Sequence, residues 1–156
     1  MRKIIFLSKL RRKNKIQIVE PNKEVKDAYL DRSDESMYSA KTLLKIGNLR
    51  DSVAMIYYSM YYTLLALLFE TGIKCENHSA AIIILKEVFD IDNSKISESK
   101  KERVDKQYYV DFSVTKKEVE DLIKNAEGFN NELLNFIDKL NSDDINKYRK
   151  KFLKIT

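Results

Sequence analysis

The chain has 156 residues, of which 44% are hydrophobic and 34% are charged, a balance typical of one globular domain and not of a disordered chain. One cysteine, Cys75, and one histidine, His78, exclude an internal disulfide and any metal site built from several such ligands, and we expect neither metal nor cofactor. The formal net charge of +5 arises in residues 1–19, which hold seven basic residues and no acid, because residues 20–156 hold 22 basic and 24 acidic residues.

We interpret residues 1–20 as a basic N-terminal arm and residues 21–156 as the folded domain. Within the arm, the alternation of Lys15–Glu20 predicts a short strand or an extended segment. Pro21 and Asn22 mark the boundary, and Asn22 is a suitable N-cap for the helix that follows. Two interpretations of the arm stay open: contact with RNA, DNA or an acidic partner, or a solvated leader without a binding role.

Three glycines and one proline in the whole chain favour long helices joined by short links. Apolar spacing predicts helices at 23–46, 48–71, 78–89 and 116–140, a short helix at 142–153 that Ser142 caps, and a further short helix at 97–107. Thr115 and Glu118 form a capping box ahead of the fourth long helix, and Glu102 can pair with Lys106. The expected fold is all-α: an antiparallel up-and-down bundle of four to five helices with a basic N-terminal extension.

Residues 53–69 carry no charge over 17 positions, close to the length of a membrane span. Tyrosines occupy the middle of this run, whereas membrane helices place tyrosine at the bilayer interfaces. The run therefore predicts the central helix of a cytoplasmic protein with no membrane association.

Tyr57, Tyr58, Tyr61 and Tyr62 form the first candidate feature, because i,i+4 spacing stacks Tyr57 on Tyr61 and Tyr58 on Tyr62. Such rings bind bases in some proteins, but more often they are core or dimer contacts. The second feature is His78 in the first turn of a helix, where the helix dipole depresses its pKa. It is either a local hydrogen-bonding residue or a general base.

The third feature is Arg103, followed five residues later by Tyr108 and then by Tyr109. A guanidinium can hold a phosphate while a nearby phenol ring stacks or donates a hydrogen bond. The alternative is a surface arginine paired with Asp105 or Glu102, which would contribute little to stability.

Three segments together resemble the HEPN superfamily, named for higher-eukaryote and prokaryote nucleotide binding, and more closely its uncharacterised archaeal members. They are Ala54–Tyr62 (AMIYYSMYY), Gly72–His78 (GIKCENH) and Arg103–Asp111 (RVDKQYYVD), and the resemblance runs from Val19 through the fourth long helix. It implies an antiparallel helical bundle, commonly a homodimer. Many members are metal-independent RNA endonucleases, and many pair with a minimal nucleotidyltransferase as a toxin and its antitoxin.

The nuclease motif of that superfamily is an arginine followed, after four to six residues, by a histidine. Arg103 fits the arginine, but Tyr108 stands five residues later and no histidine is near it in the sequence. A histidine titrates near neutral pH and can exchange a proton with a ribose hydroxyl, whereas a phenol is a poor base there. His78 would have to replace the missing histidine through the fold.

The resemblance therefore implies a member of a toxin–antitoxin-like pair with a minimal nucleotidyltransferase, which binds RNA or a nucleotide phosphate through Arg103. Tyr58, Tyr62 and Tyr109 are the expected RNA-contacting or nucleotide-contacting residues beside it. One alternative is a metal-independent endoribonuclease that uses Arg103 with His78 or Tyr108. The other alternative is a non-catalytic structural dimer or scaffold. Tyr108 or Tyr109 is also a candidate for modification by the nucleotidyltransferase.

Overall fold

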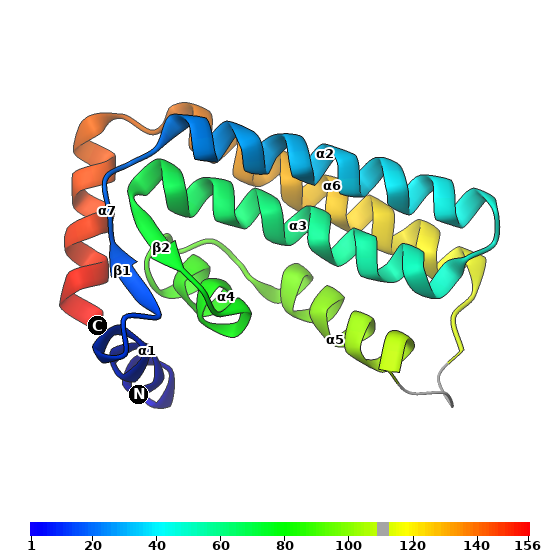
Figure 1. The fold of residues 1–156 in the computed structure, drawn as a ribbon, viewed down its shortest axis with the longest axis horizontal. Coiled ribbons are helices and arrows are strands. Elements are labelled where there is room, and N and C mark those ends of the chain that lie inside the picture. Colours follow the sequence, from blue (N-terminus) through cyan, green and yellow to red (C-terminus); the bar gives the residue numbers. More distant parts are fainter. Residues whose placement is uncertain (109–112) are drawn as a thin grey trace.

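The computed structural model describes residues 1–108 and 113–156, apart from the side chains of Gln107 and Tyr108 (Figure 1). In chain order the elements are α1 (Arg2–Arg12), β1 (Ile16–Ile18), α2 (Lys23–Lys45), α3 (Leu49–Thr71), β2 (Ile73–Cys75), α4 (His78–Glu87), α5 (Ser94–Tyr108), α6 (Lys116–Lys139) and α7 (Ser142–Ile155). The predicted all-α bundle is confirmed. In Figure 1, α2 and α5 run in one direction while α3 and α6 run in the other.

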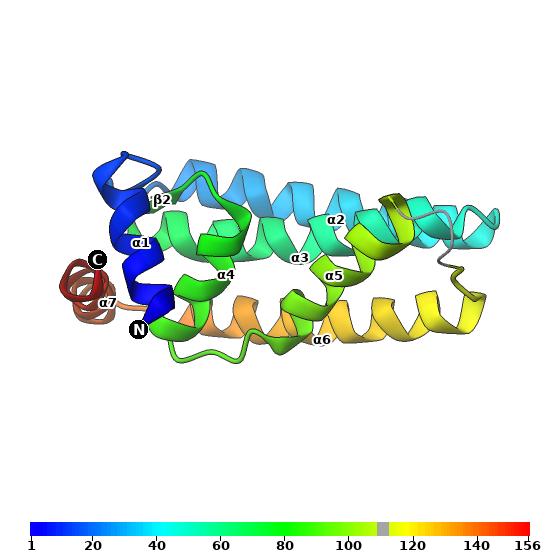
Figure 2. The ribbon, with the colours of Figure 1, turned by 90° about the horizontal axis from the view of Figure 1, so that it is seen from below.

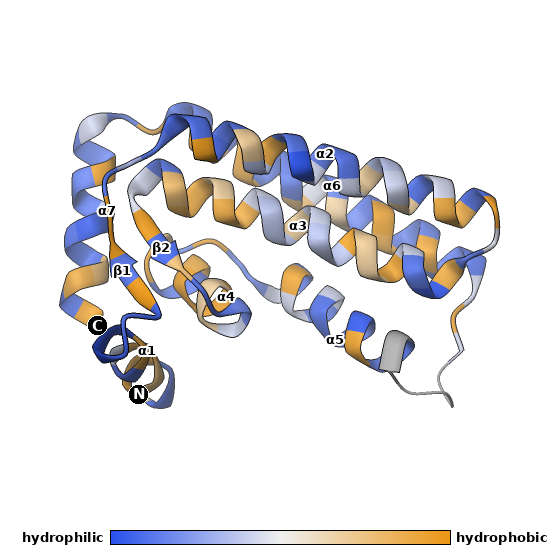
Figure 3. Ribbon diagram, viewed as in Figure 1, coloured by the Kyte–Doolittle hydropathy of each residue, from blue (hydrophilic) through white to orange (hydrophobic). Residues whose placement is uncertain are grey.

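The central helix is α3, as its uncharged sequence predicts. Most of its residues are buried, and it packs against α2, α5 and α6. It is long and apolar enough to cross a membrane, but 78% of its most apolar stretch is buried inside the fold. Figure 3 shows more hydrophobic colour along this helix than along α2 or α5, the pattern of a helix enclosed by its neighbours.

Polar side chains begin the helices largely where the sequence predicts. The side chains of Asn22 and Asn77 accept hydrogen bonds from backbone amides in the first turns of α2 and α4, and Thr115 and Glu118 form the capping box of α6. The predicted cap of α7 is wrong by one residue. Asn141, not Ser142, is the N-cap, because Asn141 and Asp144 exchange side-chain to backbone hydrogen bonds in a second capping box.

The N-terminal segment is more ordered than its sequence indicates. The predicted short strand is present as β1, which pairs antiparallel with β2, so that Ile16 faces Cys75 and Ile18 faces Ile73. Residues 2–12 form α1, a helix that the sequence does not reveal because its apolar run is only four residues long. Leu7 of α1 is fully buried in the core.

The described residues form seven helices, and α1 is the one without a predicted counterpart. The predicted short helix at 97–107 is present as α5, which begins at Ser94, three residues before the predicted start, and buries Ile96 and Ser99. Viewed from below in Figure 2, α4 lies between α1 and α5 on the same side of the molecule.

The junction between α3 and β2 sets the position of α4. Gly72 ends α3 in the left-handed conformation, at φ 72°. Nη1 of Arg149, from α7, donates hydrogen bonds to the backbone carbonyls of Val19, Thr71 and Gly72, at 2.7, 3.1 and 3.2 Å. One guanidinium therefore joins the N-terminal segment, the end of α3 and α7, and this fixes the short strand that leads to His78.

Candidate functional site

Four tyrosines on α3 form the base of the site. Tyr57 and Tyr61 stack with ring centroids 6.0 Å apart, and Tyr58 and Tyr62 stack at 6.1 Å, so the predicted i,i+4 pairs are confirmed. Tyr57 and Tyr61 are buried, whereas Tyr58 and Tyr62 are half-buried. Burial raises the pKa of Tyr57 and of Tyr61, so both phenols keep their protons at neutral pH.

His78 packs onto the buried pair from the start of α4. Its ring stacks on Tyr61 with centroids 3.8 Å apart, and its Nδ1 shares a 2.8 Å hydrogen bond with the Tyr57 hydroxyl. The pKa of His78 is lowered from 6.5, first by burial and then by the positive charges of Arg103 and Lys100. The lowered pKa matches the sequence prediction, but its main cause is burial and not the helix dipole.

Arg103 approaches the same tyrosines from α5. Its Nη1 donates a 3.2 Å hydrogen bond to the Tyr58 hydroxyl, and its Cζ lies 5.2 Å from the Tyr57 ring centroid and 5.5 Å from that of Tyr58. Its Nε is buried and has no hydrogen-bond partner in the described part of the chain. The alternative prediction of a surface ion pair with Asp105 or Glu102 is not met among the described residues, and Glu102 pairs instead with Lys106.

Lys100 is a site residue that sequence reasoning missed. It lies one turn before Arg103 on α5, and its Nζ donates a 2.5 Å hydrogen bond to Ser79 Oγ, next to His78. Burial, and then the charge of Arg103, lower the pKa of Lys100. Lys100 and Ser79 line a hollow of about 300 Å³ between α4 and α5, together with Ile82, Ile83 and Ser97. The i,i+3 spacing of two cations on α5 was the available sequence signal.

The structure therefore brings together residues of three helices, which the sequence identifies only as separate candidates. Arg103 and His78 both contact Tyr57, Arg103 also bonds to Tyr58, and Lys100 bonds to Ser79 beside His78. Tyr62 lies farther along α3, and its hydroxyl accepts a 3.2 Å hydrogen bond from Arg32 of α2. The side chain of Tyr108 and the whole of Tyr109 lie outside the described residues.

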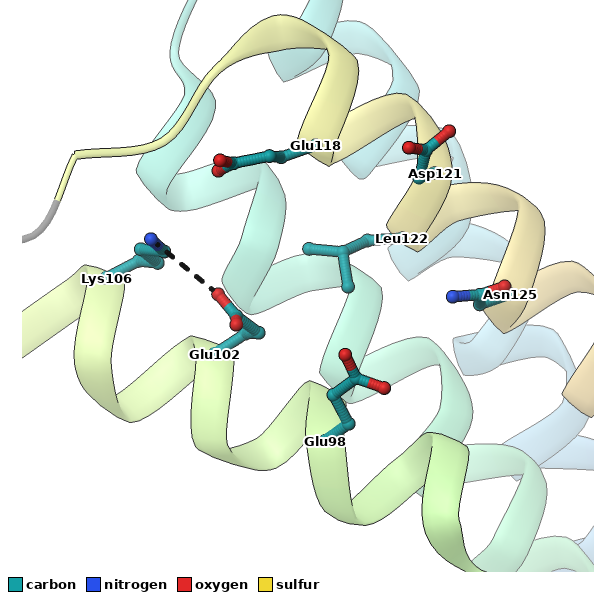
Figure 4. A pocket seen from close by; sticks show the side chains of 7 residues that line it. All are labelled: Glu98, Glu102, Lys106, Glu118, Asp121, Leu122 and Asn125. Carbon is teal, nitrogen blue, oxygen red and sulfur yellow. Dashed lines mark ion pairs between the residues drawn. The ribbon is translucent and has the colours of Figure 1, made fainter.

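The opposite side of α5 has the opposite charge. A pocket of about 300 Å³ lies between α5 and α6, and Figure 4 shows Glu98 and Glu102 on its α5 side and Glu118, Asp121 and Leu122 on its α6 side. Lys106 pairs with Glu102 there, at 3.9 Å. Across residues 1–108 and 113–156, no three acidic, cysteine or histidine side chains gather closely enough to hold a metal ion. The helix thus separates its acids from Lys100 and Arg103.

The cationic side of α5 has the chemistry of an anion site. Two cations, Arg103 and Lys100, lie near the imidazole of His78 and the rings of Tyr57 and Tyr58, and Lys100 also lines the small hollow between α4 and α5. No ion pair joins Arg103 or Lys100 to a carboxylate in the described part of the chain. Hydrogen bonds between a guanidinium or ammonium and phosphate oxygens are short and strong, and aromatic faces accept stacked bases.

The sequence profile of the HEPN domain matches residues 27–149. A segment of 56 residues is also 39% identical to a UPF0332 protein of the archaeon Pyrococcus horikoshii. That segment covers 36% of this chain and 39% of the relative's length, so the match spans well under half of either protein. The profile match includes every site residue named above on α3, α4 and α5, whereas α1 and β1 lie outside it.

Proposed function

This chain belongs to the HEPN domain family, and on that premise we propose that it binds a phosphate group of RNA or of a nucleotide at the Arg103 site. The observation that carries the proposal is the absence of a neutralising carboxylate, in the described residues, beside Arg103 and Lys100. The positive charges of Arg103 and Lys100 repel each other and disfavour protonation of His78. This repulsion lowers the stability of the folded protein. A bound anion would remove that cost.

Arg103 is the residue expected to grip the phosphate. The Tyr58 hydroxyl accepts a hydrogen bond from Nη1, and the guanidinium also lies near the rings of Tyr57 and Tyr58. These contacts fix the orientation of the guanidinium before a ligand binds. Each charge-assisted hydrogen bond to the ligand contributes about 1.5–3 kcal/mol. Lys100 adds a second positive charge, and Tyr58 and Tyr62 offer partly exposed rings to a base.

We further propose, from family membership alone, the biological setting. The protein is a cytoplasmic homodimer and one half of a toxin–antitoxin-like pair with a minimal nucleotidyltransferase. A neighbouring gene for such an enzyme, and co-purification of the two proteins after co-expression, would support the pair. Light scattering of the purified chain at several concentrations tests the dimer, and a constant mass of 18.4 kDa would refute it.

The binding proposal is tested by titrating the protein with AMP and with a labelled RNA in excess chelator. Arg103→Ala is expected to weaken the binding of both ligands about 10- to 100-fold, the value of one lost charge-assisted hydrogen bond. Lys101→Ala is the matched control, because it removes one exposed charge from the same helix. Unchanged affinity in Arg103→Ala would favour the alternative of a structural dimer or scaffold.

A second function, metal-independent RNA cleavage, is favoured by one observation: an imidazole held uncharged beside an arginine. Its chemistry depends on the tautomer of His78. If the Tyr57 hydroxyl donates to Nδ1, the neutral ring carries its proton on Nε2 and cannot accept one from a ribose hydroxyl. If Nδ1 donates to Tyr57, Nε2 is a free base.

Because His78 is the only histidine, ¹⁵N chemical shifts assign its tautomer without ambiguity. We expect the proton on Nε2, consistent with binding and little or no cleavage. RNA cleavage in excess chelator, abolished by both Arg103→Ala and His78→Ala, would instead establish the nuclease. Tyr108, the other candidate base, is tested by Tyr108→Phe in the same assay.

A further inference from the structure

A second cationic surface lies at the end of the molecule where α1 meets α7. Seven exposed basic side chains on these helices and the α1 C-cap define it, and we call it the α1–α7 basic surface: Arg2, Lys3, Lys9, Arg12, Lys13, Lys150 and Lys154. None of the seven forms an ion pair with a carboxylate in the described residues. Exposed lysines elsewhere differ among themselves: Lys41 pairs with Glu127 and Lys117 with Asp121, whereas Lys116 and Lys124 have no such pair in the described residues.

Helix stability does not explain these charges. The helix dipole favours cations in the last turn, which accounts for Lys9 and Arg12 of α1. It disfavours Arg2 and Lys3 in the first turn, where α1 has no acid. Lys9 and Lys13 are also like charges at i,i+4 spacing, which is unfavourable in an isolated helix. A partner with negative charge supplies the missing compensation.

The surface is rigidly presented and is not a loose tail. Leu7 is fully buried, and Phe6 and Leu10 pack against the core, which turns the basic side of α1 outward. Nη1 of Arg11 donates hydrogen bonds to Thr156 Oγ1, at 3.1 Å, and to the Leu153 carbonyl, at 3.5 Å, which joins α1 to the end of α7.

We propose that the α1–α7 basic surface binds the phosphate backbone of an RNA strand and extends the site at Arg103, an inference that rests on the proposed function. Figure 2 shows α4 between α1 and α5 on one side of the molecule.

An RNA backbone fits this surface better than a membrane does. Membrane binding by a helix needs a broad apolar face in addition to positive charge. Here Phe6, Leu7 and Leu10 of α1 pack inside the fold, and the exposed large apolar side chains on this surface are Met1, Ile5 and Leu153. Seven basic side chains accompany these three, so the surface offers much charge and no broad apolar face, as phosphate-backbone contact requires.

The test measures how the affinity of the full chain for a 20-nucleotide RNA depends on salt concentration. Three sets of lysine or arginine to glutamine changes are compared: Lys9→Gln with Arg12→Gln and Lys13→Gln on α1, Lys150→Gln with Lys154→Gln on α7, and Lys116→Gln with Lys124→Gln and Lys139→Gln on α6. The α6 set is the matched control, because its lysines are also exposed. Thermal melts verify that each variant is folded.

Each lost phosphate contact lowers the slope of log affinity against log salt by about 0.7 for a single strand. The α1 set is therefore expected to flatten the slope by about 2 and to weaken binding on the order of 100-fold at 50 mM salt. The α7 set is expected to flatten it by about 1.4, and the α6 set to leave it nearly unchanged. An unchanged slope in the α1 set, or equal flattening by the α6 set, overturns the proposal.

Two further measurements separate this surface from the Arg103 site and from a membrane. The α1 set is expected to bind AMP as the unmodified protein does, since a mononucleotide reaches only the Arg103 site. If Arg103→Ala leaves AMP binding unchanged while the α1 set still flattens the RNA slope, the proposed function fails and the basic surface stands. If the α1 set instead loses binding to phosphatidylserine vesicles and keeps its RNA slope, the surface is a membrane contact and the proposal is wrong.

Discussion

Replacing Arg103 by methionine is expected to change the free energy of unfolding by no more than about 1 kcal/mol, because its gains and losses nearly cancel. The loss is the hydrogen bond to Tyr58 and the two contacts with the faces of Tyr57 and Tyr58, about 2–3 kcal/mol together. The gain is the removal of a buried, unpartnered Nε, about 1–3 kcal/mol, and of the repulsion with Lys100 and His78.

Arg149→Met provides the contrast within the same protein. Arg149 donates to three backbone carbonyls that hold Val19, Thr71 and Gly72 together, so its loss leaves all three without this donor. We expect a destabilisation of at least about 3 kcal/mol. For a chain of this length about 1 kcal/mol corresponds to 2–4 °C, so the melting temperature of Arg149→Met should fall by roughly 6–12 °C.

The assay is thermal unfolding followed by circular dichroism, with and without AMP at ten times its dissociation constant. Ligand at that concentration stabilises the folded state by about 1.4 kcal/mol. The unmodified protein and Arg149→Met should both gain several degrees, whereas Arg103→Met should gain nothing measurable. If Arg103→Met is as unstable as Arg149→Met and still responds to AMP, then Arg103 is a structural residue and the reasoning about its unpaired charge is wrong.

Three further predictions concern the imidazole and the end of α3. Burial, Arg103 and Lys100 lower the pKa of His78 in the folded protein below 6.5, so the unfolded chain takes up a proton at a higher pH than the folded chain does. The melting temperature should therefore fall as the pH drops below 6.5, and it should fall less in Arg103→Met. Tyr57→Phe removes the hydroxyl bonded to Nδ1 and should shift the ¹⁵N signals of His78 while lowering stability by only about 1 kcal/mol; unchanged ¹⁵N signals would contradict the contact. Gly72→Ala should lower the free energy of unfolding in denaturant by at least about 2 kcal/mol. Residue 72 has a left-handed backbone, and an added β-carbon would meet the guanidinium of Arg149, which bonds to the carbonyl of the same residue. An unchanged free energy of unfolding would refute the close packing of this junction.

Features set by local spacing could be predicted from the sequence. The i,i+4 spacing of the tyrosines stacks them whatever surrounds the helix, and capping residues such as Asn22 and Thr115 act through the first turn that follows them. The central position of α3 also follows from its lack of charge. These interactions connect residues no more than four positions apart, so no knowledge of the tertiary fold is required.

Features that depend on packing between distant segments could not be predicted. His78 reaches Tyr57 because Arg149 and the pairing of β1 with β2 fix the start of α4. The alternation of residues 15–20 predicts the strand β1, but neither its partner strand nor the contacts of Arg149 can be predicted from the sequence. The helix α1 could not be predicted for the same reason. Its apolar residues are too few to indicate a core helix, and the burial of Leu7 in the core of the bundle stabilises it.

The lack of an ion pair at Arg103 could, however, be predicted from the sequence of α5. On a helix, the side chains that can neutralise a residue stand three or four positions away. Around Arg103 these positions hold no acid; they are Ser99, Lys100, Lys106 and Gln107. The acids of α5 stand elsewhere, with Glu98 and Glu102 on the pocket of Figure 4. The described neighbours on α3 and α4 contribute hydroxyl groups, aromatic rings and an imidazole in place of carboxylates. The described neighbours therefore leave the charge of this guanidinium without a carboxylate partner, and the proposed phosphate would supply an anionic one, since a guanidinium can donate two parallel hydrogen bonds to phosphate oxygens.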